Sequence, residues 1–286
     1  MIIRTDVCRR LYASAALFVL TSFCIASDAS AQAESSIESN YLTNIRQVTS
    51  TSDATVKFVK AGEGYFSPDS KTIVYQAVRS EYPFYQIFTQ PLDGGEPKLI
   101  STGRGRTTCA YFSPDGKRIL FASSHINPDL AALETSERKQ QEADRKSGKR
   151  RHYSWPFDRY MDMFVSDLDG RIIKRLTFED GYDAEGAYSR DGKQIAYCHV
   201  DEVPASEGDA AAQAPNPDIY VMNADGTGKR QITSAPGYDG GPFISPDGNW
   251  IVFRSDRKKA HYLQIHVIGI DGKNEVEVTT KPTRTH

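Results

Sequence analysis

The chain has 286 residues, of which 39% are hydrophobic and 25% charged, so it can bury a sizeable core and is typical of a globular protein. Its formal net charge of −2 gives no general attraction to nucleic acid or to an anionic membrane, and we expect neither as a partner. Fifteen Tyr and thirteen Phe favour strands, because aromatic side chains suit the pleated surface of a sheet.

The first 31 residues have the features of a secretory signal peptide. Three arginines precede an apolar run over residues 11–25, and Ala29–Ala31 forms a small-residue cleavage site. The run is short for a membrane span, although a retained membrane anchor is the alternative interpretation. We therefore expect residues 32–286 to be periplasmic or secreted, with no stable membrane insertion after cleavage.

Only two cysteines, Cys109 and Cys198, follow the predicted cleavage site. Two thiols in a chain of this length do not form the disulfide framework of a small secreted domain. We expect both to be small buried residues of the core.

The rest of the sequence contains one motif four times. Each copy combines a Ser-Pro-Asp-Gly-like turn with an apolar run rich in β-branched and aromatic residues; the copies are Ser67–Tyr75, Ser113–Phe121, Ser189–Tyr197 and Ser245–Phe253. A second signature follows each copy, starting at Gln86, Asp162, Asp218 and Gln264, and an Asp-Gly pair lies seven residues after each start. Internal repeats of this kind decide the fold class.

The spacing of the motif serines defines the repeat unit. The serines are 46, 76 and 56 residues apart, and the longer spacings arise between the motif and the second signature. Removing the extra 30 and 10 residues there restores 46 in every case. The sequence thus predicts a 46-residue unit with insertions at residues 124–161 and 203–217.

Each unit is predicted to contain four short antiparallel strands. Pro, Asp and Gly in the motif suit a hairpin turn, so Gly116, Gly192 and Gly248 should have positive φ, and Ser70 should be the most strained residue in that slot. Four-stranded units of this length are typical of an all-β β-propeller. We expect blades near residues 61–101, 107–177, 183–233 and 239–280; a β-sandwich, the alternative, does not predict a fixed period.

The first insertion is predicted to carry a helix. Asn127-Pro128-Asp129 can cap and begin it, and an Ala-, Leu-, Glu- and Lys-rich run continues to Ser147-Gly148. A basic cluster follows at residues 149–152, with several aromatic residues after it. The insertion is either a docking lid or a solvated helix whose acidic and basic residues balance.

The repeat resembles the WD-like repeats of TolB-type periplasmic propellers. The resemblance rests on Ser-Pro-Asp-Gly-Lys-x-Ile-x-Phe, Asp-Ile-Tyr-x-Met-Asn-x-Asp-Gly and Arg-Gln-Ile-Thr, and it covers about residues 46–280. It implies a propeller that binds a protein or peptide partner in the cell envelope, since TolB links envelope proteins in the Tol–Pal system. TolB has six blades behind a smaller α/β domain, for which the segment before the first repeat leaves no room.

The four predicted blades are fewer than the six of that family. Residues 45–49 resemble a lone last strand, and the chain ends before a fifth motif serine. We therefore expect an incomplete six-bladed ring rather than a genuine four-bladed one. Apolar side chains of the end blades should then be partly uncovered, namely Phe66, Ile73, Tyr75, Phe243, Ile251 and Phe253.

The loops before the first strand of each blade should surround the mouth of a central channel. Mixed charges there suit a small polar ligand, a peptide terminus or a cation, whereas the alternative is hydrogen bonding between blades. The candidate binding residues are Glu63, Arg104, Arg106, Tyr182, Asp183, Glu185, Tyr238 and Asp239.

Sequence motifs for catalysis are absent: there is no Gly-x-Ser-x-Gly elbow, His-Glu-x-x-His pair or Gly-rich phosphate loop. The leading hypothesis is a non-enzymatic binding scaffold without a cofactor. One alternative is a carbohydrate- or lactone-processing propeller enzyme whose metal is held by Glu63, Asp183, Glu185 and Asp239. Another is the gate propeller of a peptidase of the prolyl oligopeptidase type.

Overall fold

The computed structural model describes residues 45, 47–49, 58–149, 156–201, 216–279 and 283–284. By its contacts the chain divides into residues 1–48 and 49–286, and every strand and helix named below belongs to the second unit. The predicted signal peptide, Arg46, Glu202 and residues 203–215 of the second insertion lie outside the described residues. The described part of the predicted lone strand, Ile45 and Gln47–Thr49, is not in a strand.

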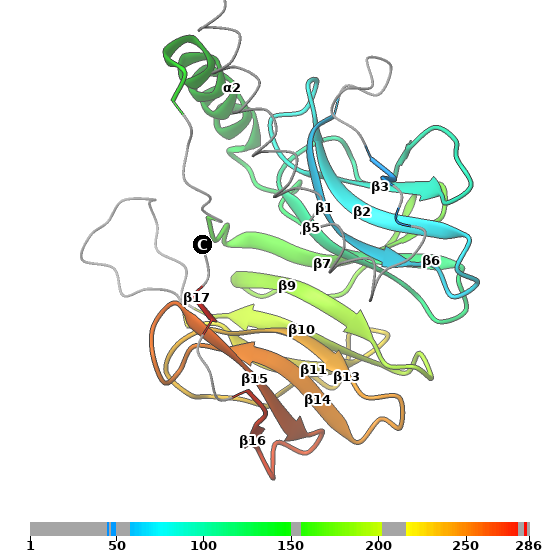
Figure 1. Cartoon of the computed structure of the whole chain (residues 1–286), viewed down its shortest axis with the longest axis vertical. Coiled ribbons are helices and arrows are strands. Elements are labelled where there is room, and N and C mark those ends of the chain that lie inside the picture. The colour runs from blue at the N-terminus through cyan, green and yellow to red at the C-terminus, as the bar shows by residue number, and fades with distance from the viewer. Residues whose placement is uncertain are drawn as a thin grey trace, which may run out of the picture. The chain divides into compact units, whose positions relative to one another are not determined.

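The described chain is mostly β and contains four consecutive antiparallel runs of four strands (Figure 1). The first run is β1 (Phe58–Phe66), β2 (Thr72–Arg79), β3 (Gln86–Pro91) and β4 (Lys98–Leu99). The second is β5 (Thr107–Phe112), β6 (Arg118–Ser123), β7 (Tyr160–Asp167) and β8 (Ile172–Arg175). The third is β9 (Gly181–Tyr188), β10 (Gln194–Val200), β11 (Asp218–Asn223) and β12 (Arg230–Gln231). The fourth is β13 (Asp239–Ile244), β14 (Trp250–Ser255), β15 (Tyr262–Gly269) and β16 (Val276–Glu277), and β17 (Thr283–Arg284) also pairs with β15.

The runs are not wholly separate sheets. A short parallel pairing joins β7 to β9, with Tyr160 opposite Gly181 and Met161 opposite Tyr182, so the second and third runs form one eight-stranded sheet (Figure 1). The sequence predicted only antiparallel pairing within each blade. The difference arises because β9 begins two residues before the predicted blade start and lies beside the start of β7.

The turn between the first and second strands is the same in all four runs. Its serine hydroxyl donates to the aspartate carboxylate two residues on, at 2.5–2.7 Å, and the aspartate accepts a backbone N–H from two residues further, at 3.0–3.1 Å. The predicted positive φ is confirmed: it is 69°, 71° and 77° at Gly116, Gly192 and Gly248, and 57° at Ser70.

Exchanging residues at this turn position should shift stability in opposite directions. The left-handed backbone of Ser70 costs free energy because the residue has a Cβ, so Ser70→Gly should raise the free energy of unfolding by about 0.5–1 kcal/mol. An added Cβ at Gly248 would meet nothing within 4 Å, so Gly248→Ser should lower it by about 0.5–1 kcal/mol through the backbone alone. Urea denaturation of both variants checks the signs; a shift in the same direction for both would contradict this account.

A second repeated network ties the third strand to the fourth. In each run, one Ser or Thr hydroxyl bonds to the first two residues of the second signature. It donates to the side chain of the first, which is Gln or Asp, at 2.7–3.1 Å. It accepts the backbone N–H of the next residue at 2.8–3.0 Å. The hydroxyls belong to Ser101, Thr177, Thr233 and Thr279. These bonds explain why Ser or Thr stands two residues after the end of each fourth strand.

The apolar core lies between successive runs. One cluster joins Val74, Ile87 and Ile100 of the first run to the second run, and a large cluster around Met161 and Met163 joins the second to the third. A third cluster joins the third run to Ile251 and Phe253 of the fourth. The described sheets do not close into a ring.

The prediction of six partly uncovered apolar residues is only half right. Phe66 is exposed, and Ile73 and Phe243 are half-buried, but Tyr75, Ile251 and Phe253 are buried. Ile251 and Phe253 face the third run because alternate side chains of a strand point to opposite faces. Tyr75 is covered by Phe58 of β1, whose ring lies 5.9 Å from it.

The first insertion contains α2 (Leu130–Ser147), which ends at Gly148 with a φ of 68°, so the predicted helix is confirmed. Asp129 is the N-cap residue of the helix, but its side chain makes no capping hydrogen bond. The helix contacts the loop before β5 through Glu134, which accepts from Arg104 at 2.8 Å. Arg150–Trp155 lie outside the described residues. In the ranges that the structure covers, no helix is long and apolar enough to cross a membrane.

Candidate functional site

The first strand of each run contains one residue in the left-handed conformation. Glu63, Cys109, Glu185 and Gly241 have φ of 51°, 54°, 57° and 61°, and each lies four residues before a motif serine. The strand pairing shifts register at the same place in all four runs, which defines a repeated β-bulge. A bulge turns side chains away from the regular alternation and can aim them at a site.

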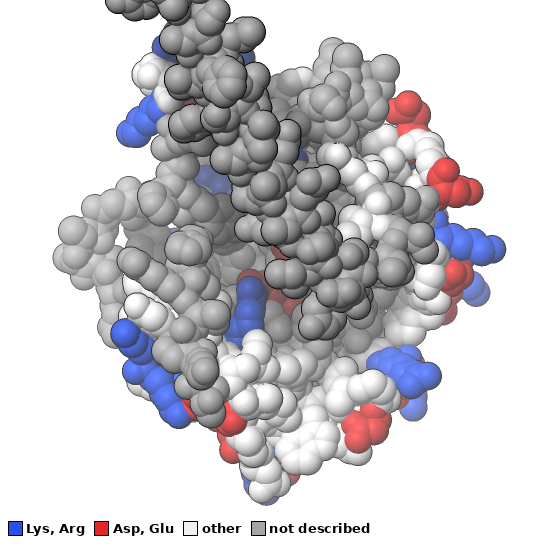
Figure 2. All heavy atoms as spheres, viewed as in Figure 1, with Lys and Arg blue, Asp and Glu red and all other residues white. Residues whose placement is uncertain are grey.

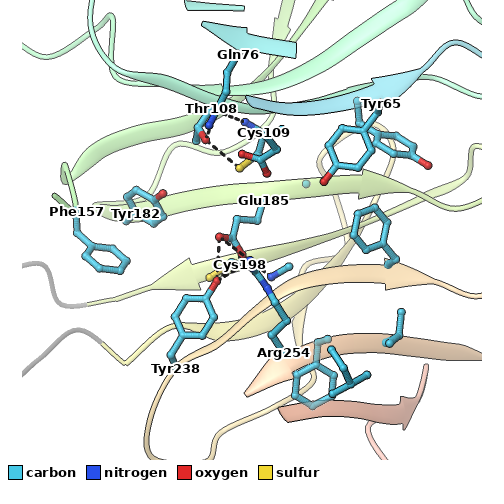
Figure 3. A pocket seen from close by; sticks show the side chains of 18 residues that line it. Tyr65, Gln76, Thr108, Cys109, Phe157, Tyr182, Glu185, Cys198, Tyr238 and Arg254 are labelled. Carbon is cyan, nitrogen blue, oxygen red and sulfur yellow. Dashed lines mark hydrogen bonds and ion pairs between the residues drawn. The ribbon is translucent and has the colours of Figure 1, made fainter. Parts of the chain in front are cut away.

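These four residues line one cavity of about 750 Å³. Phe157 and Tyr182 lie at one end of it and Tyr65 at the other, with Cys109 and Glu185 between them (Figure 3). Figure 2 shows basic and acidic atoms inside the hollow of this face as well as around its edge. The first strands of all four runs therefore contribute to a single candidate binding site.

Three aromatic rings lie near one another at one end of the cavity. The ring centroids of Tyr65 and Tyr111 are 5.2 Å apart, and Phe243 lies 5.8 Å and 6.1 Å from them. All three occupy the position two residues after the bulge, where the third run has Ala187. Burial, and secondarily the charge of Glu63, raises the pKa of Tyr65, so its hydroxyl stays neutral.

Glu185 is held by partners from the fourth run. Its carboxylate accepts from the Tyr238 hydroxyl at 2.9 Å and from the backbone N–H of Gly241. The Arg254 guanidinium donates to the Tyr238 oxygen at 3.1 Å and lies 3.5 Å from Glu185 (Figure 3). Burial first, and then the Glu185 charge, raises the pKa of Tyr238. The cluster is thus a neutral phenol between one carboxylate and one guanidinium.

Glu63 has a sparser environment. Its carboxyl lies near the Cys109 thiol, and the Cys109 sulfur lies 3.0 Å from the Thr108 hydroxyl, which donates to Gln76 at 2.8 Å. The side chain of Glu63 reaches the cavity. Desolvation by the surrounding protein raises its pKa, the thiol lowers it, and the charge of Glu185 raises it further. Burial also raises the pKa of Cys109, which keeps the thiol neutral.

The structure brings together four of the eight predicted binding residues: Glu63, Tyr182, Glu185 and Tyr238. The other four have structural partners instead. Asp183 lies 2.7 Å from His199 and Asp239 lies 2.5 Å from Arg257. Arg104 pairs with Glu134 of α2. Arg106 lies over the Phe84 ring at 4.5 Å and 3.7 Å from Asp158.

The proposed four-carboxylate metal centre is not assembled. Glu63 and Glu185 line the cavity, but the buried Asp183 and Asp239 are engaged as just described. Within the described ranges, no three His, Cys, Asp or Glu side chains are gathered as metal ligands. The alternative with that ligand set is therefore wrong, because Asp183 pairs with His199 of β10 and Asp239 pairs with Arg257, which follows β14.

Sequence reasoning missed the aromatic end of the cavity, Cys109 and Arg254. The available signal was positional: the bulge and ring residues stand four and two places before each motif serine. Their identities differ among the runs, so a search by residue type does not find them. Arg254 carries no such signal.

The room for the Glu185 cluster depends on Gly240. A Cβ at Gly240 would lie 2.2 Å from the Tyr238 hydroxyl and 2.7 Å from Glu185, so Gly240→Ala should cost about 2 kcal/mol of stability and displace Tyr238. Gly62 holds the equivalent position in the first run, where an added Cβ meets nothing within 4 Å. Gly62→Ala should change stability by less than about 0.5 kcal/mol. Thermal unfolding of both variants measures the difference; equal losses would contradict the packing argument.

Repeated four-stranded antiparallel runs around a common cavity define a propeller-like fold, and the comparisons agree. A Tol-Pal system protein TolB from Anaeromyxobacter sp. (strain K) is 28% identical over 167 residues, which cover 58% of this chain and 28% of that protein. TolB from Acinetobacter baumannii matches with a TM-score of 0.52 and 22% identity over 78% of this chain and 43% of its own. A TolB-type protein from Agrobacterium tumefaciens matches with a TM-score of 0.53 and 21% identity over 77% and 65%.

These similarities show a TolB-like propeller fold for the chain. No family model matches the sequence. The chain spans less than a third of the length of the curated relatives it matches.

Proposed function

We propose that this chain is a non-enzymatic binding scaffold that acts outside the cytoplasm and receives a protein or peptide partner at the central cavity. In this proposal the four runs are four propeller blades, and the predicted signal peptide exports the chain. One observation carries the binding role: all four first strands bulge at the same position and line one cavity of about 750 Å³. This volume is in the range of ligand sites.

The composition of the lining supports recognition rather than simple packing. Aromatic rings supply large apolar contact area, while the Glu185 cluster and Glu63 supply polar groups at fixed positions. The similarity to a protein named for the Tol-Pal system supports an envelope partner. The partner is a protein or peptide, with no nucleic acid and no cofactor.

A photo-crosslinking residue tests this function in cells that export the chain. Phe157 lines the cavity, so benzoylphenylalanine at that position should give a light-dependent adduct with a defined envelope protein, identified by mass spectrometry. The control probe replaces Lys193, an exposed residue of a turn between first and second strands. A folded, exported chain that gives no adduct at position 157, or the same adduct at both positions, would rule out the cavity as the docking site.

A further inference from the structure

The cavity contains two carboxylates but one guanidinium. Arg254 lies beside Glu185 and Tyr238, and its charge lowers the pKa of Glu63 less than the charge of Glu185 raises it. The neighbouring phenols and thiols are neutral, because burial raises the pKa of Tyr65, Tyr238 and both cysteines. The described lining therefore carries a net negative charge, located at Glu63.

The Glu185 cluster shows how this cavity holds a cation. The Arg254 guanidinium is 3.1 Å from the Tyr238 hydroxyl, 3.5 Å from the Glu185 carboxylate and 5.8 Å from the Tyr238 ring. A carboxylate and an aromatic ring together attract an organic cation through its charge and through the electron-rich ring face.

Glu63 offers the same combination without a bound cation. Among the described residues, its carboxyl is influenced by the neighbouring Cys109 thiol and, more weakly, by the charges of Glu185 and Arg254. The rings of Tyr65 and Tyr111 line the same cavity. Glu63 is also held in a left-handed conformation, which costs about 1–2 kcal/mol for a residue other than glycine. Strain of that kind at a cavity-lining carboxylate is typical of a binding position.

We propose that the cavity binds an organic cation of the partner, the ammonium or guanidinium group of a Lys or Arg side chain, between Glu63 and the rings of Tyr65 and Tyr111. This inference rests on the proposed function, because it places a side chain of the partner in the cavity. An extended cationic side chain suits the site, because its apolar stem can contact the rings while its charge reaches the carboxylate.

Short peptides provide the binding test on the full chain. Acetyl-Gly-Lys-Gly-amide and acetyl-Gly-Arg-Gly-amide carry the cation, and acetyl-Gly-norleucine-Gly-amide has a matched apolar side chain without charge. We expect at least one cationic peptide to bind about tenfold or more tightly than the norleucine peptide, by calorimetry or by ligand-observed NMR. Equal affinities for all three peptides would overturn the proposal.

Two carboxylate variants locate the effect. Glu63→Gln keeps the shape of the side chain and should abolish the preference for the cationic peptide. Glu96→Gln, at an exposed position in the turn after β3, should leave the preference unchanged. A preference that survives Glu63→Gln, in a variant with an unchanged unfolding midpoint, would overturn the assignment of Glu63.

The crosslinking experiment separates this inference from the proposed function. If Glu63→Gln lowers the yield of the adduct at position 157 by about tenfold, both proposals stand. An unchanged yield would overturn the cation site and leave the scaffold function intact. Absence of the adduct in the unchanged chain would overturn the scaffold function itself.

Discussion

Replacing Ile100 with Asp is expected to lower the free energy of unfolding by about 4 kcal/mol or more, whereas Val278→Asp should change it by less than about 0.5 kcal/mol. The two residues hold the same place, seven residues after the Asp of each Asp-Gly pair. In the first three runs this place is buried between neighbouring runs: Ile100, Leu176 and Ile232 are 1%, 2% and 8% exposed, and Val278 is 57% exposed.

The difference follows from what covers each position. Ile100 packs against Phe112 and Ile119 of the second run, so an ionised carboxylate there would be buried without a partner. In the described part of the chain, no run packs on the corresponding face of the fourth run, so the Val278 position keeps water around it. Circular dichroism with urea titration measures both variants.

Two less disruptive substitutions at the same positions allow a quantitative comparison if the Ile100→Asp variant does not fold. Ile100→Val should cost about 1 kcal/mol, while Val278→Ala should cost less than about 0.5 kcal/mol. Equal losses at the two positions would mean that the outer face of the fourth run is covered in solution as the others are.

The turns were the most predictable part of the fold. Each depends on contacts within five residues: a serine hydroxyl, an aspartate carboxylate and a left-handed residue such as Gly192. Because every partner in these contacts lies within the motif or directly beside it, a Ser-Pro-Asp-Gly sequence is enough to predict the turn. The α2 helix was predictable for the same reason, since helix propensity and a terminal glycine are local properties.

The site was less predictable because it depends on the bulge. Glu, Cys, Glu and Gly share no chemistry, yet the backbone of all four has the same left-handed conformation. Charged residues chosen by type, such as Asp183, instead pair with side chains of a neighbouring strand, 16 residues away at His199. The parallel pairing of β7 with β9 was also invisible, because it joins only two residue pairs from separate repeats.

Removing Arg257 should cost about 3–5 kcal/mol, because it would leave the fully buried carboxylate of Asp239 without its counter-ion. The guanidinium lies 2.5 Å from Asp239 and 2.5 Å from Glu275, and it also donates to the Ser255 hydroxyl at 2.9 Å. Arg257→Met keeps much of the side-chain volume and tests the charge. Lys258→Met is the matched control: its pair with Glu277 is at the surface, where water and salt screen the charges, so its loss should leave stability nearly unchanged.

Two further measurements identify Asp239 as the source of the loss. Adding Asp239→Asn to Arg257→Met should recover part of the stability, because a neutral amide replaces the unpaired charge.

The second measurement is the pH dependence of the loss. Burial already raises the pKa of Asp239, and Arg257 lowers it, so removing Arg257 should raise this pKa further. A carboxyl whose folded pKa exceeds its unfolded value stabilises the fold below the unfolded pKa, and that contribution is lost as pH rises. The cost of Arg257→Met should therefore be smaller at pH 4 than at pH 7, and a cost independent of pH would place its origin elsewhere.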